Sequence, residues 1–369
     1  MTHITSIGLD VHARSITAAA FNPATGEVTT KRFGNCPAEL ASWVLGFEKP
    51  KAVYESGVTG FYLVRELKAL GVDCIIGAVS KMFKPAANKK KKNDTEDAIF
   101  LARMLCANNI VEVMVPDKEC EAMRDISRAL EDVREDLIRA KQRLSKFLLR
   151  HGYVFTEFNA DGSRKGNWTR AHWEWIRKIK FSEIADDETF AYYISEVRHF
   201  EAHKKEIEKF IREHAKKDRW CGRVEALRCL KGIETMTAFA IVVEAQVFSR
   251  FDSASAFASW IGLIPSENSS GEIERKGGIT KAGNSHVRKL LIEASWSYVR
   301  ATADRKRNDW GEIVPLRVEN HAAKGTKRLV ERRRTLKARG KKPVIANCAT
   351  AREMACWIWA IGRMCEDTL

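Results

Sequence analysis

The chain has 369 residues, a length typical of two or three domains. Hydrophobic residues make up 45% and charged residues 30%, which excludes wholesale disorder, and no apolar run reaches the roughly 18 residues of a membrane-spanning helix. The net charge of +15 predicts a polyanionic partner, most simply nucleic acid.

The positive charge is concentrated in the C-terminal third. Residues 276–342 hold 19 Lys or Arg against 6 Asp or Glu, so we expect the phosphate footprint there. The N-terminus lacks a basic stretch followed by an apolar core, and the nine cysteines include no Cys-x-x-Cys pair. We therefore expect a cytoplasmic protein with reduced thiols and no membrane partner.

Residues 1–116 are predicted to form an α/β domain. Strands over 7–11, 15–21 and 27–33 are joined by short links, which favours an antiparallel meander. Helix and strand then alternate, with helices over 38–47, 61–70 and 94–105 and strands over 52–54 and 74–79. Asp94 stands at the start of the last helix and is expected to cap it. The pattern predicts a mixed sheet with helical cover.

Residues 117–222 change character. Apolar residues from Met123 to Phe147 keep a 3-4 spacing over more than three heptads, which predicts a long coiled-coil-like helix. An irregular, aromatic-rich stretch separates it from a second amphipathic helix over 190–216. Two such helices usually pair as a hairpin or as an interface between subunits.

Residues 223–369 are predicted to be mostly helical. We expect helices over 236–245, 254–261, 285–300 and 344–364, and we expect the basic run 324–342 to be partly mobile.

Four carboxylates occupy related positions in the first domain. Asp10 follows the first strand, Glu55 ends a later one, and Asp94 and Asp97 share a helix face because they are three residues apart. Carboxylates at one sheet edge repel each other unless divalent cations neutralise them. One or two Mg²⁺ ions there would activate a water or stabilise a leaving oxygen in phosphodiester chemistry. Separate surface acids are the alternative for any one residue.

Two neighbouring features leave alternatives open. His12 is either a contact for a substrate phosphate or a hydrogen-bonded polar residue of the turn after Asp10. The run Lys89, Lys90, Lys91 and Lys92 either holds a nucleic-acid backbone across the metal site or is a solvated loop.

A glycine- and serine-rich segment, 265–283, precedes the predicted helix at 285. Glycines allow a phosphate to approach the backbone, and the helix begins with its positive dipole end. A serine here could attack a phosphodiester while neighbouring Arg and Lys stabilise the developing charge, with His286 as one candidate base. On the residues alone, a loop whose serines only donate hydrogen bonds to a phosphate is the favoured interpretation. The turn at Gly232, within Leu230–Ala238, is similar to a helix-hairpin-helix turn that offers N–H groups to DNA.

Together these motifs resemble the IS-one-ten family of transposases. The Asp10…Glu55…Asp94-x-x-Asp97 set resembles the family's RuvC-like "DEDD" domain, and Asn93–Ala98 followed by Leu101–Arg103 resembles its last catalytic motif. A second set of residues resembles the family's C-terminal transposase domain: Gly262–Pro265, Ser270–Gly271, Gly278–Lys281, Gly283–Asn284 and Arg288.

The resemblance implies an architecture and an activity. The architecture is a RuvC-like (RNase H-like) α/β domain over 1–116, a coiled-coil oligomerisation region over 117–222 and a mostly α-helical transposase domain over 223–369. The activity is site-specific recombination of an insertion sequence in the bacterial cytoplasm, at the nucleoid. A non-coding bridge RNA pairs with donor and target DNA, and the chains assemble as a dimer to tetramer.

The resemblance also assigns site residues. Asp10, Glu55, Asp94 and Asp97 would hold Mg²⁺, and Ser270 would be the nucleophile, with Ser266 and Ser269 as close alternatives. The serine of one subunit would act with the carboxylates of another. Nucleic-acid contacts are implied for Lys89, Lys90, Lys91, Lys92, Gly232, Arg275, Lys276, Thr280, Lys281, Asn284 and Arg288.

Other functions remain as alternatives from the sequence. The first is a metal-dependent nuclease resembling a junction resolvase, whose C-terminal domain only binds DNA. The others are a non-catalytic RNA-binding or architectural protein and an actin-like ATPase. The segments 155–190 and 301–342 are longer than a minimal family member needs, and they either bind RNA or are elaborations.

Overall fold

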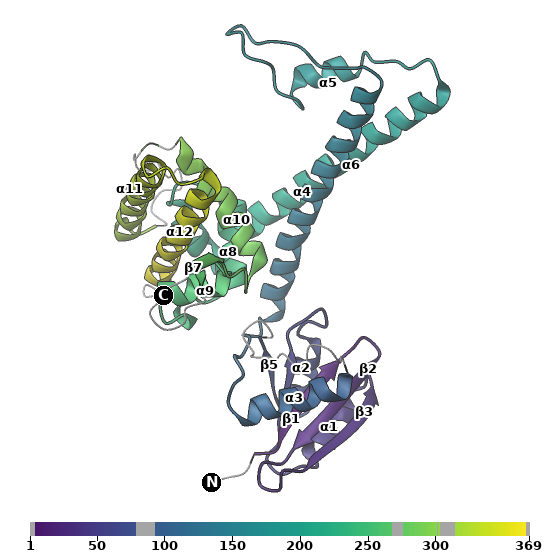
Figure 1. The fold of residues 1–369 in the computed structure, drawn as a ribbon, viewed down its shortest axis with the longest axis vertical. Coiled ribbons are helices and arrows are strands. Elements are labelled where there is room, and N and C mark those ends of the chain that lie inside the picture. The colour runs from purple at the N-terminus through teal and green to yellow at the C-terminus, as the bar shows by residue number, and fades with distance from the viewer. Residues whose placement is uncertain (1–3, 79–92, 268–275, 301, 303–313, 367–369) are drawn as a thin grey trace. The chain divides into compact units, whose positions relative to one another are not determined.

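The computed structural model describes residues 4–78, 93–267, 276–300, 302 and 314–366 (Figure 1). The chain divides into two compact units, one of Met1–Glu119 with Lys281–Gly283 and one of Cys120–Thr280 with Asn284–Leu369. Within the described ranges, every helix is too short or too polar to cross a membrane.

The first unit is built on a five-stranded sheet of order β3-β2-β1-β4-β5. Strands β1 (Ser6–Val11), β2 (Ser15–Phe21) and β3 (Val28–Gly34) pair antiparallel. Strands β4 (Lys51–Glu55) and β5 (Asp73–Gly77) extend the sheet from β1 in parallel. The predicted mixed sheet with its antiparallel meander is confirmed.

Helices cover both faces of this sheet. Helices α1 (Pro37–Leu45) and α2 (Tyr62–Ala69) bury Ile7 and Leu9 of β1 on one face. Helix α3 (Asp94–Cys106) buries Val53 and Ile75 on the other face through Leu101. Because side chains alternate along a strand, Gly8 and Asp10 belong to the face that α3 covers.

Helix α3 crosses β1 at Gly8 (Figure 1). A Cβ atom at Gly8 would lie 2.0 Å from the carbonyl oxygen of Ala98 and 2.5 Å from the backbone nitrogen of Ala102. No side chain fits at that separation, so glycine is required for the helix to lie this close to the strand.

The N-cap of α3 corrects the sequence prediction. Asn93, and not Asp94, is the capping residue: its side-chain oxygen accepts a hydrogen bond from the backbone N–H of Thr95 at 3.1 Å. Asn caps helices as well as Asp does, and only the backbone shows which of two neighbours has the extended conformation of a cap. Asp94 is therefore the first helical residue, and its carboxylate is not used for capping.

The second unit begins with two long helices, α4 (Lys118–Arg150) and α6 (Ile184–Ala215). Ion pairs Arg134–Glu208 at 3.3 Å and Lys141–Glu201 at 2.7 Å show that the helices run antiparallel. Leu144 and Phe147 share a buried cluster with Phe190 and Val197. The two predicted helices are present, whereas a coiled coil between subunits stays a prediction. The stretch between them, expected to be irregular, holds the short helix α5 (Arg170–Ile176).

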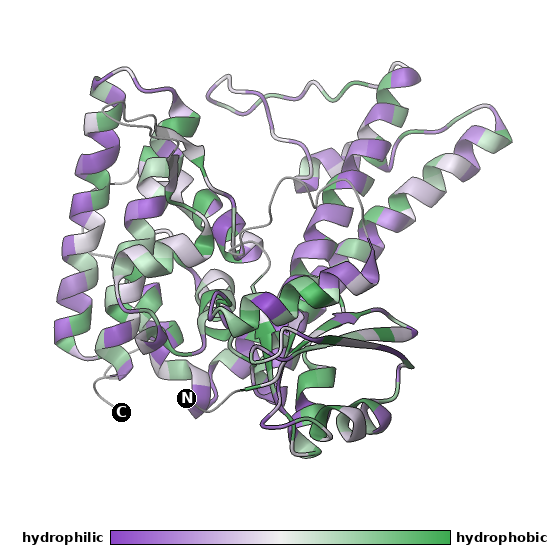
Figure 2. Cartoon of the chain, turned by 60° about the horizontal axis from the view of Figure 1, so that its bottom comes forward, coloured by the Kyte–Doolittle hydropathy of each residue, from purple (hydrophilic) through white to green (hydrophobic). Residues whose placement is uncertain are grey.

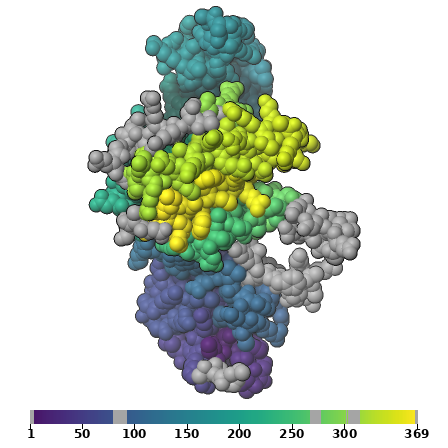
Figure 3. All heavy atoms as spheres, turned by 90° about the vertical axis from the view of Figure 1, so that its left-hand side faces the viewer, coloured from purple at the N-terminus to yellow at the C-terminus, as the bar shows by residue number. Residues whose placement is uncertain are grey.

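The remainder of this unit is a helical bundle that also contains a two-stranded β-hairpin. Its core contains Phe239, Phe248 and Phe257. In chain order the elements are α7 (Asp218–Arg228), α8 (Thr235–Ala245), η3 (Phe248–Arg250), α9 (Ala254–Ile261), β6 (Pro265–Glu267), β7 (Lys276–Ile279), α10 (Ser285–Ser295), η4 (Trp296–Val299), α11 (Leu316–Ala338) and α12 (Pro343–Glu366). Figure 3 shows α11 and α12, in yellow-green and yellow, side by side on one face.

The expectation of partial mobility for the basic run 324–342 is wrong for most of its length. Helix α11 extends to Ala338, and hydrophilic and hydrophobic residues alternate along it (Figure 2). Val318, Ala322, Leu329 and Val330 are buried in the common core at helical spacing. The charges obscured this apolar stripe in the sequence.

Replacing Gly8 by Ala tests the close approach of α3. The added methyl group meets backbone atoms, so we expect roughly 3 kcal/mol of destabilisation of the first unit. Hydrogen exchange of peptides from β1 and α3 should then be about 100-fold faster. Gly34→Ala is the matched control, because nothing lies within 4 Å of a Cβ atom there. Equal protection in both variants would contradict the packing.

Candidate active site

Asp10 and Glu55 lie at one edge of the sheet. In the parallel pair of β1 and β4, Leu9 is aligned with Tyr54, so the next residues on the two strands are Asp10 and Glu55. Tyr54 belongs to the cluster under α1 and α2, whereas Val53 faces α3. Alternation therefore places Asp10 and Glu55 on the face of α3.

The start of α3 brings further ligand atoms to this edge. His12 Nε2 lies 3.0 Å from Asp10 Oδ2 and 3.5 Å from Asp94 Oδ1. One ligand atom from each of these three residues lies within 4.8 Å of the other two. Among the described residues, Glu55 and Asp97 fall outside this group of three. Their part in metal binding stays a prediction.

The electrostatics of Asp10 match a cation site. Burial raises the pKa of Asp10, and the negative charges of Asp94 and Asp97 raise it further. His12 opposes them through its charge and its hydrogen bond, which lower the pKa. An ionised cluster here needs positive charge, and a divalent cation supplies it.

The donor set fits a small divalent cation. Carboxylate oxygens are the ligands that Mg²⁺ and Mn²⁺ prefer, and an imidazole nitrogen is compatible with Mn²⁺. Asp10 and Asp94 would supply the oxygens. His12 would be a ligand or would hold Asp10 in place by its hydrogen bond. The sequence left the role of His12 open, and the structure adds it to the acidic cluster.

A hollow of about 220 Å³ adjoins Asp94. Lys31 and Arg32, exposed on β3, line it together with Asn93 and Thr95. Neither cation belongs to a motif that the sequence predicts. The signal that could have revealed them is the polar run Thr29–Arg32 of edge strand β3. Its partner strand, β2, runs to the metal site. Arg32 places positive charge beside Asp94, where a phosphate next to the metal would lie. The Lys31 ammonium instead lies 5.0 Å from the centroid of the Phe33 ring, on the face of the sheet that α1 covers.

Several predicted site residues lie outside the described residues: Lys89, Lys90, Lys91, Lys92, Ser269, Ser270 and Arg275. Ser266 is described, and its hydroxyl donates a hydrogen bond to the carbonyl oxygen of Gly278 at 3.0 Å. That bond joins β6 to β7. Lys276 begins β7, and the backbone N–H of Thr280 donates to Ile264.

The strand β7 leads to α10, whose start is fixed by Asn284. Its side chain caps the helix by accepting from the N–H of Val287 at 2.9 Å and donates to Glu244 at 2.7 Å. Arg288, one turn into α10, donates to the carbonyl oxygen of Ile261 at 2.7 Å. Lys281 has a positive φ of 57° between β7 and the helix.

Glu244 is the centre of a buried charged network that the sequence did not reveal. Only 2% of its side chain is exposed, and Arg128 of α4 donates to both of its carboxylate oxygens at 2.8 and 3.1 Å. Arg124, one turn earlier, donates to the backbone carbonyls of Val243 and Glu244. The network ties α4, α8 and the start of α10 together.

His286 contacts Ser127 of α4, with 3.2 Å between Nε2 and Oγ. Burial lowers the pKa of His286, so its ring is neutral at neutral pH. A neutral imidazole can accept a proton, and its role as the base for a serine stays a prediction.

The Gly232 turn makes internal contacts. Gly232 has φ +88°, and a Cβ atom there would lie 2.5 Å from Ser297 Oγ. The backbone N–H of Lys231 donates to Thr326, and Tyr298 donates to the carbonyl oxygen of Lys231. These contacts explain the glycine without DNA, and a phosphate contact at Gly232 stays a prediction.

Asp10→Asn should abolish the stabilisation of the chain by divalent cations. In the wild type, saturation with Mn²⁺ at about 100 times its dissociation constant adds about 2.7 kcal/mol to the free energy of unfolding. We expect the variant to lose this gain. Without metal it should be at least as stable as the wild type, because burial and neighbouring acids disfavour the charge at Asp10.

Thermal unfolding with and without Mn²⁺ measures both effects. Asp73→Asn is the control, since Asp73 is an exposed acid of the same sheet paired with Lys51. A gain from Mn²⁺ that survives in Asp10→Asn would contradict the site.

Glu244→Gln should destabilise the second unit by about 3 kcal/mol, because it leaves two arginines beside a neutral amide. Denaturant unfolding measures the loss. In Glu174→Gln, which breaks the exposed pair Arg170–Glu174, we expect no measurable change. Equal stability of the two variants would contradict a structural role for the network.

Two family models match the chain. One, named for the DEDD transposases of IS110 and described as "Transposase", covers residues 7–152. The other, "Transposase IS116/IS110/IS902 family", covers residues 224–310. The acidic cluster lies in the first match. The β6–β7 hairpin and the start of α10 lie in the second.

Curated relatives agree with these matches. The chain is 35% identical to a transposase of Sinorhizobium fredii, over 87% of this chain and 77% of the relative. It is 31% identical to the transposase for insertion sequence element IS1533 of Leptospira borgpetersenii, over 79% of this chain and 84% of the relative. The chain therefore belongs to the IS110 family of transposases, enzymes that bind DNA and cut and rejoin its strands.

Proposed function

We propose that this transposase is a bridge-RNA-guided recombinase that cuts and rejoins DNA through a serine nucleophile aided by a metal-binding carboxylate cluster. The observation that carries the proposal is the meeting of Asp10, His12 and Asp94 at one sheet edge, in a chain of the IS110 family. Guidance by a non-coding RNA and assembly into a dimer to tetramer rest on the motif resemblance.

The carboxylates would hold Mg²⁺ with Asp10 and Asp94 as ligands, and Glu55 and Asp97 complete the set. A bound Mg²⁺ would stabilise negative charge on the phosphate and the leaving oxygen. Arg32, beside Asp94, would bind the non-bridging oxygens of the same phosphate or of its neighbour along the strand.

The serine segment would supply the nucleophile. The serine Oγ loses its proton and forms a bond to phosphorus, the bond from phosphorus to one bridging oxygen breaks, and that oxygen takes up a proton. Rejoining reverses these steps with a deoxyribose hydroxyl of the other DNA strand. The hydroxyl of Ser266 already donates to Gly278 across the hairpin, which supports Ser270, with Ser269 next, as the reacting residue.

The basic surface of the second unit suits a nucleic-acid partner. Helix α11 exposes Lys324, Lys327, Arg328, Arg334 and Lys337 while its apolar stripe is buried. Such a surface binds phosphates without reading sequence. Lys276, Lys281 and Arg288, around the hairpin, would steady the phosphate that the serine attacks.

A covalent protein–DNA adduct tests the serine. The assay incubates the purified protein–RNA complex with substrate DNA and Mg²⁺, traps the adduct in denaturant and maps the modified peptide by mass spectrometry. We expect the adduct on Ser270, its loss in Ser270→Ala, and its retention in Ser266→Ala, the matched control. Asp94→Asn should reduce strand cleavage by at least about 100-fold, since it removes a metal ligand.

The competing function is a metal-dependent nuclease that resembles a junction resolvase. It is favoured by the fact that the described acidic cluster is formed by the first unit's own residues. In that case Ser270→Ala leaves cleavage intact and no adduct forms, while Asp94→Asn still abolishes cleavage. This pattern would refute the serine mechanism and retain the metal site.

A further inference from the structure

The end of the α4–α6 hairpin, residues 141–183, is positively charged, and its residues 153–183 lie outside both family matches. The first match ends at residue 152, and the second begins at residue 224. Within 141–183 the sequence has 10 Lys or Arg and 4 Asp or Glu. We call this segment the hairpin end. Its charge favours a polyanion.

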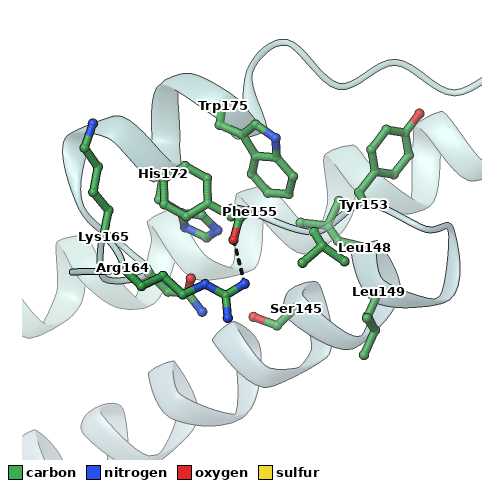
Figure 4. A pocket seen from close by; sticks show the side chains of 11 residues that line it. Ser145, Leu148, Leu149, Tyr153, Phe155, Arg164, Lys165, His172 and Trp175 are labelled. Atoms are coloured by element: carbon green, nitrogen blue, oxygen red, sulfur yellow. Dashed lines mark hydrogen bonds between the residues drawn. The ribbon is translucent and has the colours of Figure 1, made fainter. Parts of the chain in front are cut away.

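A pocket of about 410 Å³ opens in the hairpin end (Figure 4). Its walls come from three segments: the last turns of α4, the connection that follows, and α5. The volume lies within the range of sites for small organic groups, about 300–1,000 Å³. The pocket is therefore large enough for a nucleobase and part of its sugar.

One wall of the pocket is aromatic and fixed in place. The rings of His172 and Trp175 stack with 5.4 Å between centroids and 19° between planes, and Phe155 packs edge-on against His172. His172 Nδ1 accepts a hydrogen bond from the backbone N–H of Trp168 at 3.0 Å. A wall of this kind offers flat contact area at little entropic cost.

Polar and cationic groups also line the pocket. Arg164 donates to the carbonyl oxygen of Phe155 at 2.9 Å, which holds its guanidinium at the pocket (Figure 4). Lys165 pairs with Glu157, and Asn167 is exposed. An amide and two cations beside aromatic rings match the edge of a base and its phosphate.

We propose that this pocket binds an unpaired nucleobase of a single-stranded nucleic acid, with Arg164 and Lys165 contacting the adjoining phosphate. Proteins recognise single strands by combining stacked bases with a positively charged groove, and paired bases within a duplex cannot enter a pocket. RNA and DNA present the same chemistry here. The site depends on the chain binding nucleic acid and is independent of the serine and of the metal.

Photo-cross-linking tests the pocket in the full-length chain. The probes are a 12-nucleotide RNA containing 4-thiouridine and a 12-nucleotide DNA containing 4-thiothymidine, with cross-linked peptides mapped by mass spectrometry. We expect cross-links on peptides containing Tyr153 or Trp175, with base stacking contributing about tenfold or more to their yield. An abasic competitor, which keeps the phosphates, should displace the probe at least about tenfold less well than an intact one.

Two variants separate the pocket from general surface charge. Leu149 is 64% exposed at the pocket, so Leu149→Trp should fold normally, fill the opening and reduce these cross-links about tenfold. Arg164→Ala should reduce them similarly. Arg170→Ala removes the same charge from a fully exposed side chain outside the pocket and should change them less than about twofold.

The outcomes are decisive in either direction. Equal losses in Arg164→Ala and Arg170→Ala with none in Leu149→Trp would show a charged surface only and overturn the proposal. So would cross-links confined to other peptides. Efficient cross-linking by only the RNA or only the DNA probe identifies which strand the pocket holds. Adduct formation on the serine is measured separately, so failure of one proposal does not imply failure of the other.

Discussion

The packing of α3 against β1 is the constraint on which the metal site depends. Gly8 lets the helix backbone approach the strand to a distance that a methyl group would block. Because Asp10 follows Gly8 by two residues, it points to the same face, and the first turn of α3 brings Asp94 to it across His12. Any shift of the helix axis would separate these ligand atoms, so a backbone contact without charge controls the geometry of a charged site.

The second unit solves a related problem with charge. The segment proposed to carry the nucleophile lies between β6 and β7, and β7 leads directly to α10. The capping residue of α10, Asn284, is bonded to Glu244, which Arg128 also binds. A buried carboxylate with such partners is costly to disrupt and fixes one arrangement of three helices. Each half of the proposed chemistry thus has its own framework.

The sequence predicted the parts of the fold that are governed by apolar periodicity. The strands through Asp10 and Glu55 and the helix behind Asp94 follow from alternation and spacing, as do α8 and α9. Features decided by tertiary contacts were missed: His12 joining the acids, Glu244 buried with arginines, and the hairpin end with α5. Asn93, and not Asp94, caps α3. The apolar stripe of α11 was missed because its many Lys and Arg residues dominate the composition of that segment.

The central claim is that the edge of the sheet at Asp10 binds a divalent cation. Anomalous diffraction from crystals of the full chain soaked in Mn²⁺ tests it most directly. We expect a peak about 2.1–2.3 Å from carboxylate oxygens of both Asp10 and Asp94. If the ion binds elsewhere on a chain that is folded and active in strand cleavage, or binds only to surface acids, the assignment of this site is wrong.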